Sequence, residues 1–185
     1  RKLKKLLSVM RKLKKLFLAL SVLLLISCAV NVKMVEDDFY GEKSYHYQTS
    51  YMSVGDIEFR FTATKNPAVI TLEAQYVKYE AFTVSKGDKI VLRFNDDTFV
   101  NLNYINDMPS VSSYYSSYSF NSYWGVSVPI NSYTINAAAR INNDIGTLTA
   151  IRIENSGGFK NLDVSKSFAN TFQKAYNDIK NKINE

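Results

Sequence analysis

The sequence predicts an α+β fold, namely a mainly antiparallel β-sheet with a C-terminal amphipathic helix and one short internal helix. From residue 45 onward, short segments rich in Val, Ile, Tyr, Phe and Thr alternate with turn-forming residues, which is typical of strands and hairpins. The C-terminal segment instead repeats apolar residues every three or four positions, which is the helical period. Since the strands precede this helix, we expect it to cover one face of the sheet.

The first 27 residues have the pattern of a signal peptide. Eight of the chain's 23 Lys and Arg residues lie within residues 1–15. The apolar run that follows, residues 16–26, has the length expected of a signal peptide, whereas a membrane-spanning helix needs about 20 apolar residues. The block RKLKKL occurs twice, and Met10 precedes the second copy, so translation starting at Met10 or upstream would both give a leader.

The net charge of the chain without its leader indicates whether a nucleic acid could be its partner. The whole chain has a formal net charge of +6, but residues 28–185 carry 15 cations and 17 acids. The basicity therefore belongs to the leader. Because nucleic-acid binding needs a basic face on the folded domain, we expect no nucleic-acid partner.

The single cysteine, Cys28, follows the apolar run directly. One cysteine cannot form an intramolecular disulfide, which leaves pairing between chains, reactivity or modification. The stretch Leu25-Ile26-Ser27-Cys28 resembles the lipobox of bacterial lipoproteins. This resemblance implies cleavage before Cys28 and attachment to a membrane through N-terminal acyl chains on Cys28. The alternative is an ordinary secretory leader that is cut nearby, with Cys28 lost or free.

The residues after the cysteine indicate which membrane holds the anchor and predict a linker between the anchor and the domain. Ala29 stands where many such lipoproteins carry the aspartate that retains them in the inner membrane, so the resemblance implies a lipid-anchored protein of the cell envelope, in the outer membrane. Residues 28–44 are interpreted as the lipidated N-terminus and a polar tether. Its acidic cluster, Glu36, Asp37 and Asp38, either keeps the linker solvated or is a sorting signal. Residues 45–185 form the single α+β domain.

Several segments of this domain have the features of strands. Residues 57–61 alternate apolar and polar side chains, and residues 69–79 continue that period after a Lys-Asn-Pro break. A third run, residues 80–84, precedes the turn Ser85-Lys86-Gly87-Asp88. Hairpins are predicted for residues 89–104, around Asn95-Asp96-Asp97, and for residues 147–164, around Asn155-Ser156-Gly157-Gly158.

Two helices are predicted. Residues 133–141 have an alanine-rich centre, and Ser132 is a candidate N-cap. The C-terminal helix has an apolar stripe that consists of Phe168, Phe172, Ala175, Tyr176, Ile179 and Ile183. It leaves Lys166, Lys174, Asp178 and Lys182 for solvent.

The segment from Lys86 to the end is also similar to small bacterial envelope lipoproteins of unknown function. The shared pattern comprises Gly87-Asp88-Lys89, Asp96-Asp97, Ile151-Arg152-Ile153-Glu154 and Ser156-Gly157-Gly158, followed by a closing helix. This similarity implies the same domain architecture and location. It implies no activity.

Motifs for catalysis, metals or cofactors are not found in the sequence. The one histidine, His46, has no nucleophile-elbow motif to accompany it, and we interpret it as a surface or strand-edge residue. No calcium loop, zinc spacing or glycine-rich phosphate loop occurs, so no cofactor and no metal are expected. Four aspartates are interpreted as turn formers: Asp88, Asp96, Asp97 and Asp107.

The most unusual composition is that of residues 110–124, SVSSYYSSYSFNSYW. Tyrosine gives a large contact area with few rotatable bonds, and serine and asparagine adapt their hydrogen bonds, as in engineered binding loops. This segment is therefore either a loop that binds a glycan or a protein, or an exposed edge strand with a structural role. The ligand-binding candidates are Tyr114, Tyr115, Tyr118, Tyr123 and Trp124.

Together these features favour a non-enzymatic cell-envelope lipoprotein that is a binding or structural module. The alternative is a small envelope hydrolase that acts on glycan or peptidoglycan. A hydrolase would bring two or more titratable side chains with perturbed pKa values together in a deep pocket. A binding module would instead present Trp124 and Tyr118 in one exposed groove.

Lipidation of Cys28 is directly testable. Cells that are fed a tagged palmitate are expected to incorporate the tag into this protein, and the intact mass of the native protein will then correspond to an acylated chain that begins at Cys28. An unlabelled mature chain in the culture fluid would contradict the prediction.

Overall fold

The computed structural model describes residues 32–37, 44–121 and 124–185. The folded unit spans Val32–Glu185. The leader and Cys28 lie outside the described residues. No helix within the described ranges is both long and apolar enough to cross a membrane.

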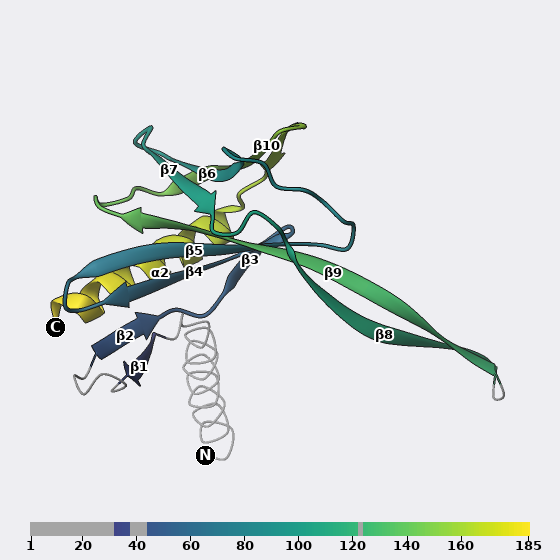
Figure 1. The fold of residues 1–185 in the computed structure, drawn as a ribbon. Helices are drawn as coiled ribbons and strands as arrows, with labels where there is room; N and C mark the ends of the chain where they lie inside the picture. Colours follow the sequence, from purple (N-terminus) through teal and green to yellow (C-terminus); the bar gives the residue numbers. More distant parts are fainter. Residues whose placement is uncertain (1–31, 38–43, 122–123) are drawn as a thin grey trace, which may run out of the picture. The chain divides into compact units, whose positions relative to one another are not determined.

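The described residues form one sheet of eleven strands and the helix α2 (Figure 1). The main path of the sheet has the order β1-β2-β4-β5-β9-β7-β6-β10-β11, with β3 paired to β4 and β8 paired to β9. The strands are β1 (Lys33–Asp37), β2 (Ser44–Gln48), β3 (Met52–Val54), β4 (Ile57–Thr64), β5 (Val69–Lys78), β6 (Lys89–Phe94), β7 (Phe99–Tyr104), β8 (Ser110–Asn121), β9 (Trp124–Ile141), β10 (Leu148–Asn155) and β11 (Gly158–Leu162).

Every strand pair in the sheet is antiparallel, which confirms the predicted fold class. Both predicted hairpins form, as β6–β7 and β10–β11. Their turns use residues that tolerate a left-handed backbone, since Asp97 has φ 59° and Gly158 has φ 131°. Asp88 and Asp96 form turns as predicted: Asp88 accepts from the Ser85 N–H, and Asp96 accepts from the Thr98 N–H.

The core lies between α2 (Lys166–Asn184) and the inner face of the sheet, which we define as the face toward α2. Alternation along β4 and β5 buries every second side chain, so that the other side chains lie on the outer face. The helix begins at Ser165, whose hydroxyl accepts from the Phe168 N–H at 3.1 Å. The predicted stripe is confirmed at its centre, where Phe172, Ala175, Tyr176 and Ile179 are buried.

Aromatic rings make the densest part of this core. The Phe172 ring lies edge-on to Phe61 and Phe59, with centroid distances of 4.9 and 6.0 Å. Phe94 from β6 reaches the same ring at 6.5 Å. One helix residue therefore joins strands that are far apart in the sheet order.

The predicted internal helix at residues 133–141 is wrong, because this segment is the C-terminal half of β9. Alanine favours helices, but here the backbone is paired on both sides: Ala137 is opposite Ala74 in β5 and Tyr104 in β7. Tertiary pairing overrides local propensity. Burial of Ile135 and Ala137 on the inner face supports the strand.

Three other segments differ from the sequence analysis. Residues 110–121 form the strand β8 and not a loop, which agrees with the edge-strand alternative. Residues 33–37, assigned to the polar tether, pair with β2 as β1. Residues 80–84 form no strand, although the Phe82 ring packs 5.5 Å from that of Tyr76.

Truncation of Phe172 tests whether the aromatic cluster holds the helix to the sheet. Phe172→Ala is expected to lower the free energy of unfolding by about 3–5 kcal/mol, because it removes a fully buried ring that contacts four others. Urea denaturation measures the change. Lys174→Ala, on the exposed side of the same helix, should change it by less than about 0.5 kcal/mol; equal effects would contradict the assignment.

Candidate binding surface

The feature that sets this domain apart is a two-stranded extension of the sheet. The C-terminal half of β9, residues 133–141, pairs with β5, whereas residues 124–132 pair, among the described strands, with β8 alone. Figure 1 shows β8 and this half of β9 leaving the rest of the sheet as a twisted ribbon. We call residues 110–121 and 124–132 the arm.

The register of the arm gives it one apolar face. Residues directly opposite each other in an antiparallel pair share a face of the ribbon. Tyr114 is opposite Ile130, and Ser116 is opposite Val128. The same alternation continues along β9 to Asn136, which places this face on the outer side of the sheet.

The other face of the arm is mixed, because Val111, Tyr115 and Pro129 lie on it together with serine and asparagine side chains that bond to one another. Ser113 donates to the Asn131 side chain at 2.6 Å, and the hydroxyls of Ser117 and Ser127 lie 2.9 Å apart. Tyr115, which is opposite Pro129, also lies on this face. Both faces of the ribbon therefore present apolar side chains, and the second face adds hydrogen bonds between its own polar side chains.

Large apolar side chains of the arm are exposed. The exposed fractions are 48% for Tyr114, 43% for Val128 and 74% for Tyr115. A two-stranded hairpin is by itself marginally stable in water, and stability usually needs a third strand or a covered face. The arm as described has neither, which marks it as an element suited to contact with another surface.

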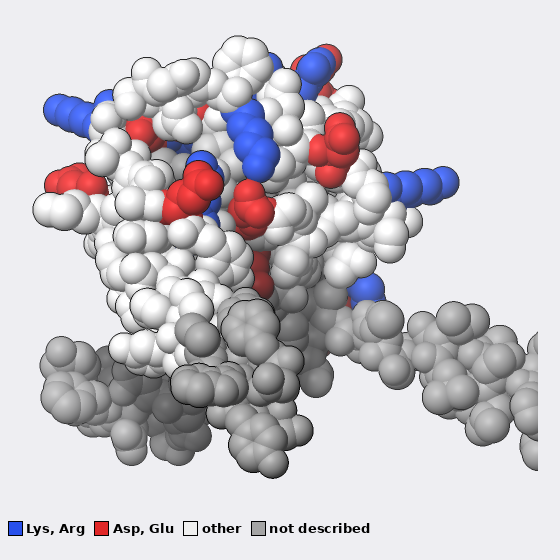
Figure 2. All heavy atoms as spheres, turned by 90° about the vertical axis from the view of Figure 1, so that its right-hand side faces the viewer, with Lys and Arg blue, Asp and Glu red and all other residues white. Residues whose placement is uncertain are grey.

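The arm also lacks charge. No Lys, Arg, Asp or Glu occurs between Asp107 and Arg140. On the face of the molecule shown in Figure 2, by contrast, cationic and anionic side chains lie next to one another. The sequence itself contains this signal. A search for uncharged segments would have marked residues 108–139 as the binding candidate, in place of residues 110–124.

The structure places two of the five binding candidates from the sequence on different faces of the arm. Tyr114 and Tyr115 lie on opposite faces of the arm. Tyr118 lies in β8 and Trp124 begins β9, while Tyr123 lies outside the described residues. The expected exposed groove of Trp124 and Tyr118 therefore stays a prediction.

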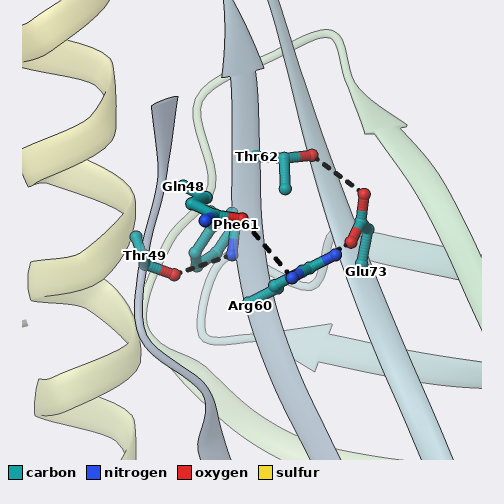
Figure 3. Close-up of polar contacts among 6 residues, drawn as sticks. All are labelled: Gln48, Thr49, Arg60, Phe61, Thr62 and Glu73. Carbon is teal, nitrogen blue, oxygen red and sulfur yellow. Dashed lines mark hydrogen bonds and ion pairs between the residues drawn. The ribbon is translucent and has the colours of Figure 1, made fainter. Parts of the chain in front are cut away.

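A polar cluster occupies the outer face of β4 and β5 (Figure 3). The Arg60 Nε donates to Glu73 at 2.7 Å, and the Thr62 hydroxyl donates to the other oxygen of the same carboxylate at 3.1 Å. Arg60 also donates to the Gln48 side chain at 3.4 Å, and its guanidinium lies 4.9 Å from the centre of the Tyr51 ring. The Glu73 carboxylate therefore has both oxygens engaged.

A cavity of about 190 Å³ adjoins this cluster and leads toward the base of the arm. Tyr51, Arg60, Glu73, Ile105 and Asn136 are among the residues that line it. The Asn136 Oδ1 is buried and has no hydrogen-bond partner among the described residues. The cavity is small and its charges are paired, which fits a structural role for the cluster.

A second cluster fastens α2 to the segment before β10. Asp144 accepts from the Tyr176 hydroxyl at 2.9 Å and from the Lys180 ammonium. The hydrogen bond from Lys180, and then that from Tyr176, lower the pKa of Asp144. Burial, and then the hydrogen bond to Asp144, raise the pKa of Tyr176 to about 12.

A wider hollow of about 620 Å³ lies on the outer face of β6 and β10. Arg93 and Arg152 line it together with Phe99 and Glu154. Arg93 is paired with Asp97 at 2.5 Å, and the Arg152 Nε donates to Asn161 at 2.9 Å. The Arg93–Asp97 ion pair is exposed, and exposed ion pairs contribute little to stability.

No group of three or more His, Cys, Asp or Glu residues in the described ranges is placed to hold a metal ion. His46 lies in β2 with its side chain exposed, opposite Val35 on one side and Thr64 on the other. Its exposed position agrees with the surface residue that the sequence predicts.

Comparison with known proteins gave no match, whether to a family model, to a curated protein or to a solved structure. The fold and the arm must therefore be interpreted from their own geometry.

The Asp144–Tyr176 contact predicts a loss of stability in alkali. Because the pKa of Tyr176 is raised above its ordinary value of 10, its contribution to stability is complete below pH 10 and is lost as the pH rises toward 12. Tyr176→Phe should therefore reduce the fall in unfolding free energy between pH 10 and 12, and remove one late-titrating phenol from an ultraviolet absorbance titration. An unchanged titration curve would contradict this.

Proposed function

We propose that this protein is a lipid-anchored module of the cell envelope that binds a partner through its arm and catalyses no reaction. The observation that carries the proposal is the uncharged arm, on which Tyr114, Tyr115 and Val128 are exposed. Exposed apolar surface on an element with no layer over it is typical of an interaction site.

Attachment to the membrane rests on the sequence. The cationic leader, the apolar run and the lipobox-like Leu25-Ile26-Ser27-Cys28 together support acylation of Cys28. Acyl chains at the N-terminus would hold the domain at a bilayer, and Ala29 after the cysteine favours the outer membrane. The folded unit begins at Val32, a few residues after the anchor.

The state of the carboxylates supports binding over hydrolysis. A general acid at neutral pH needs a carboxyl group with a raised pKa. The pKa of Asp144 is instead lowered by Lys180, and both oxygens of Glu73 are engaged by Arg60 and Thr62. These are the acidic residues that border the cavities next to β5 and α2.

The arm favours a protein partner. The edge of β8 that faces away from β9 offers backbone donors and acceptors, and a partner strand can pair with such an edge. The tyrosines add large contact area at low entropic cost. A glycan could stack on the tyrosines but could not add a strand to the edge of β8, so the two ligand classes give different results in the tests below.

Photochemical crosslinking in the intact envelope tests the proposal. With a benzophenone amino acid in place of Tyr115, irradiation should yield a protein adduct. The same substitution at Phe159, which is similarly exposed but lies in β11, should yield none. Absence of an adduct at position 115, or equal adducts at both positions, would contradict binding through the arm.

Alanine variants separate the ligand classes. A triple variant combines Tyr114→Ala, Tyr118→Ala and Trp124→Ala. If the partner is a protein, this variant and the unaltered chain should be retained equally on columns of envelope glycans. Loss of retention would show a glycan ligand in place of a protein. Lys174→Ala serves as the control, because its side chain is exposed on α2.

A further inference from the structure

We infer that the partner of the arm is a second copy of this chain, joined to the first along β8 in an antiparallel pair about a twofold axis. The inference rests on the proposed function, since it names the partner of the same surface. Three features support it: an open strand edge, the absence of charge and the need of the arm for more strands.

The open edge is that of β8. This strand pairs with β9 on one side and, among the described strands, with none on the other. Natural sheets protect such edges with charged residues, prolines or short strands. The twelve residues of β8 include no charged residue and no proline.

The two terminal strands of the sheet are protected in the usual way. Each has only five residues. β1 includes Lys33, Glu36 and Asp37, and β11 includes Lys160, which is paired with Asp56 at 3.1 Å. Among the described strands that pair with a single neighbour, β8 is the longest, and it has none of these protections.

The opposite edge of the arm is closed to pairing by Pro129. A proline can stand in a paired strand only where its nitrogen faces away from the partner. Since Pro129 is paired with Tyr115, the β9 edge that faces away from β8 lacks a donor at its centre. Each chain therefore offers one continuous open edge, which gives a closed dimer and not a fibre.

The absence of charge suits a partner that is identical to the chain itself. At a twofold interface each residue near the axis meets its own copy, so any charge there would repel its counterpart. Residues 108–139 bring no such charge to the interface. A surface adapted to an unlike, charged partner would instead carry complementary charges.

Pairing along β8 also supplies what the arm lacks. Two arms joined in this way form a four-stranded sheet in the order β9-β8-β8-β9, in which residues directly opposite each other share a face. The apolar faces of both arms, including Tyr114, Val128 and Ile130, then lie on one side and form a continuous strip. More than two strands with an apolar face satisfy the condition for a stable sheet.

The proposed twofold axis passes near the middle of β8. Because opposite residues share a face, a residue near the middle of the strand must lie opposite its own copy, and Ser116 is such a residue. Its small side chain fits a position on the axis. Directly opposed residues have Cβ atoms about 5 Å apart, within reach of a disulfide after slight adjustment.

Cysteine crosslinking in cells tests this placement with the full chain. Ser116→Cys is expected to give, under mild oxidation, a reducible species of twice the chain mass. The unaltered chain, whose only cysteine is Cys28, and Ser167→Cys, on the exposed side of α2, should remain single. Equal crosslinking of Ser167→Cys and Ser116→Cys would overturn the inference.

Charge substitutions at the same position test for a second copy specifically. Ser116→Lys and Ser116→Asp should each weaken the dimer at least tenfold, as measured by light scattering of the detergent-solubilised protein, because like charges meet at the axis. A mixture of the two variants should restore the dimer, which also shows that both variants fold. Ser167→Lys should leave the dimer unchanged.

The results also separate this inference from the proposed function. If the unaltered chain is a monomer at about 100 µM but Tyr115 still crosslinks to a protein of another mass, the arm binds a different partner and the inference is overturned. If the chain is a monomer and position 115 gives no adduct, both are overturned. An adduct of twice the chain mass supports both.

Discussion

The packing of one helix face against one sheet face is the constraint on which the rest of this structure depends. Phe172 contacts rings from β4 and β6, strands that are separated in the sheet order by three others. The apolar side chains of the sheet lie on its inner face. This face needs a second layer to be buried, and α2 provides that layer. Because the inner face is buried along β4, β5 and β6, the register of these strands cannot slip without exposing the core.

One strand, β9, belongs both to the core and to the arm, so the register fixed in the core also fixes the orientation of the side chains in the arm. β9 is held between β5 and β7 around Ala137, and the same strand continues beyond Tyr133 as one half of the arm. The alternation set in the core therefore decides which side of the arm is apolar, many residues away. A flexible loop with the same tyrosines would not present them in a defined order.

The body of the sheet carries ionic side chains, whereas the arm carries none. In the body of the sheet, ionic side chains are paired across strands, as in Arg60–Glu73 and Lys89–Glu154. The arm has no ionic side chain, and polar side chains of its two strands bond to one another, as in Ser113–Asn131 and Ser117–Ser127. The body is thus suited to remain solvated, and the arm is suited to pair with a neutral strand.

The sequence by itself determined the hairpins β6–β7 and β10–β11 and the helix α2, because turn chemistry and the helical period are local properties. It also drew attention to residues 110–124 through their composition. Tertiary structure decided the rest: Ala137–Ala139 form a strand because β5 pairs with them, and β7 also pairs with Ala137 and Ala138, although alanine locally favours a helix. The apolar face of the arm likewise follows from the pairing of Tyr114 with Ile130, a register that no single segment contains.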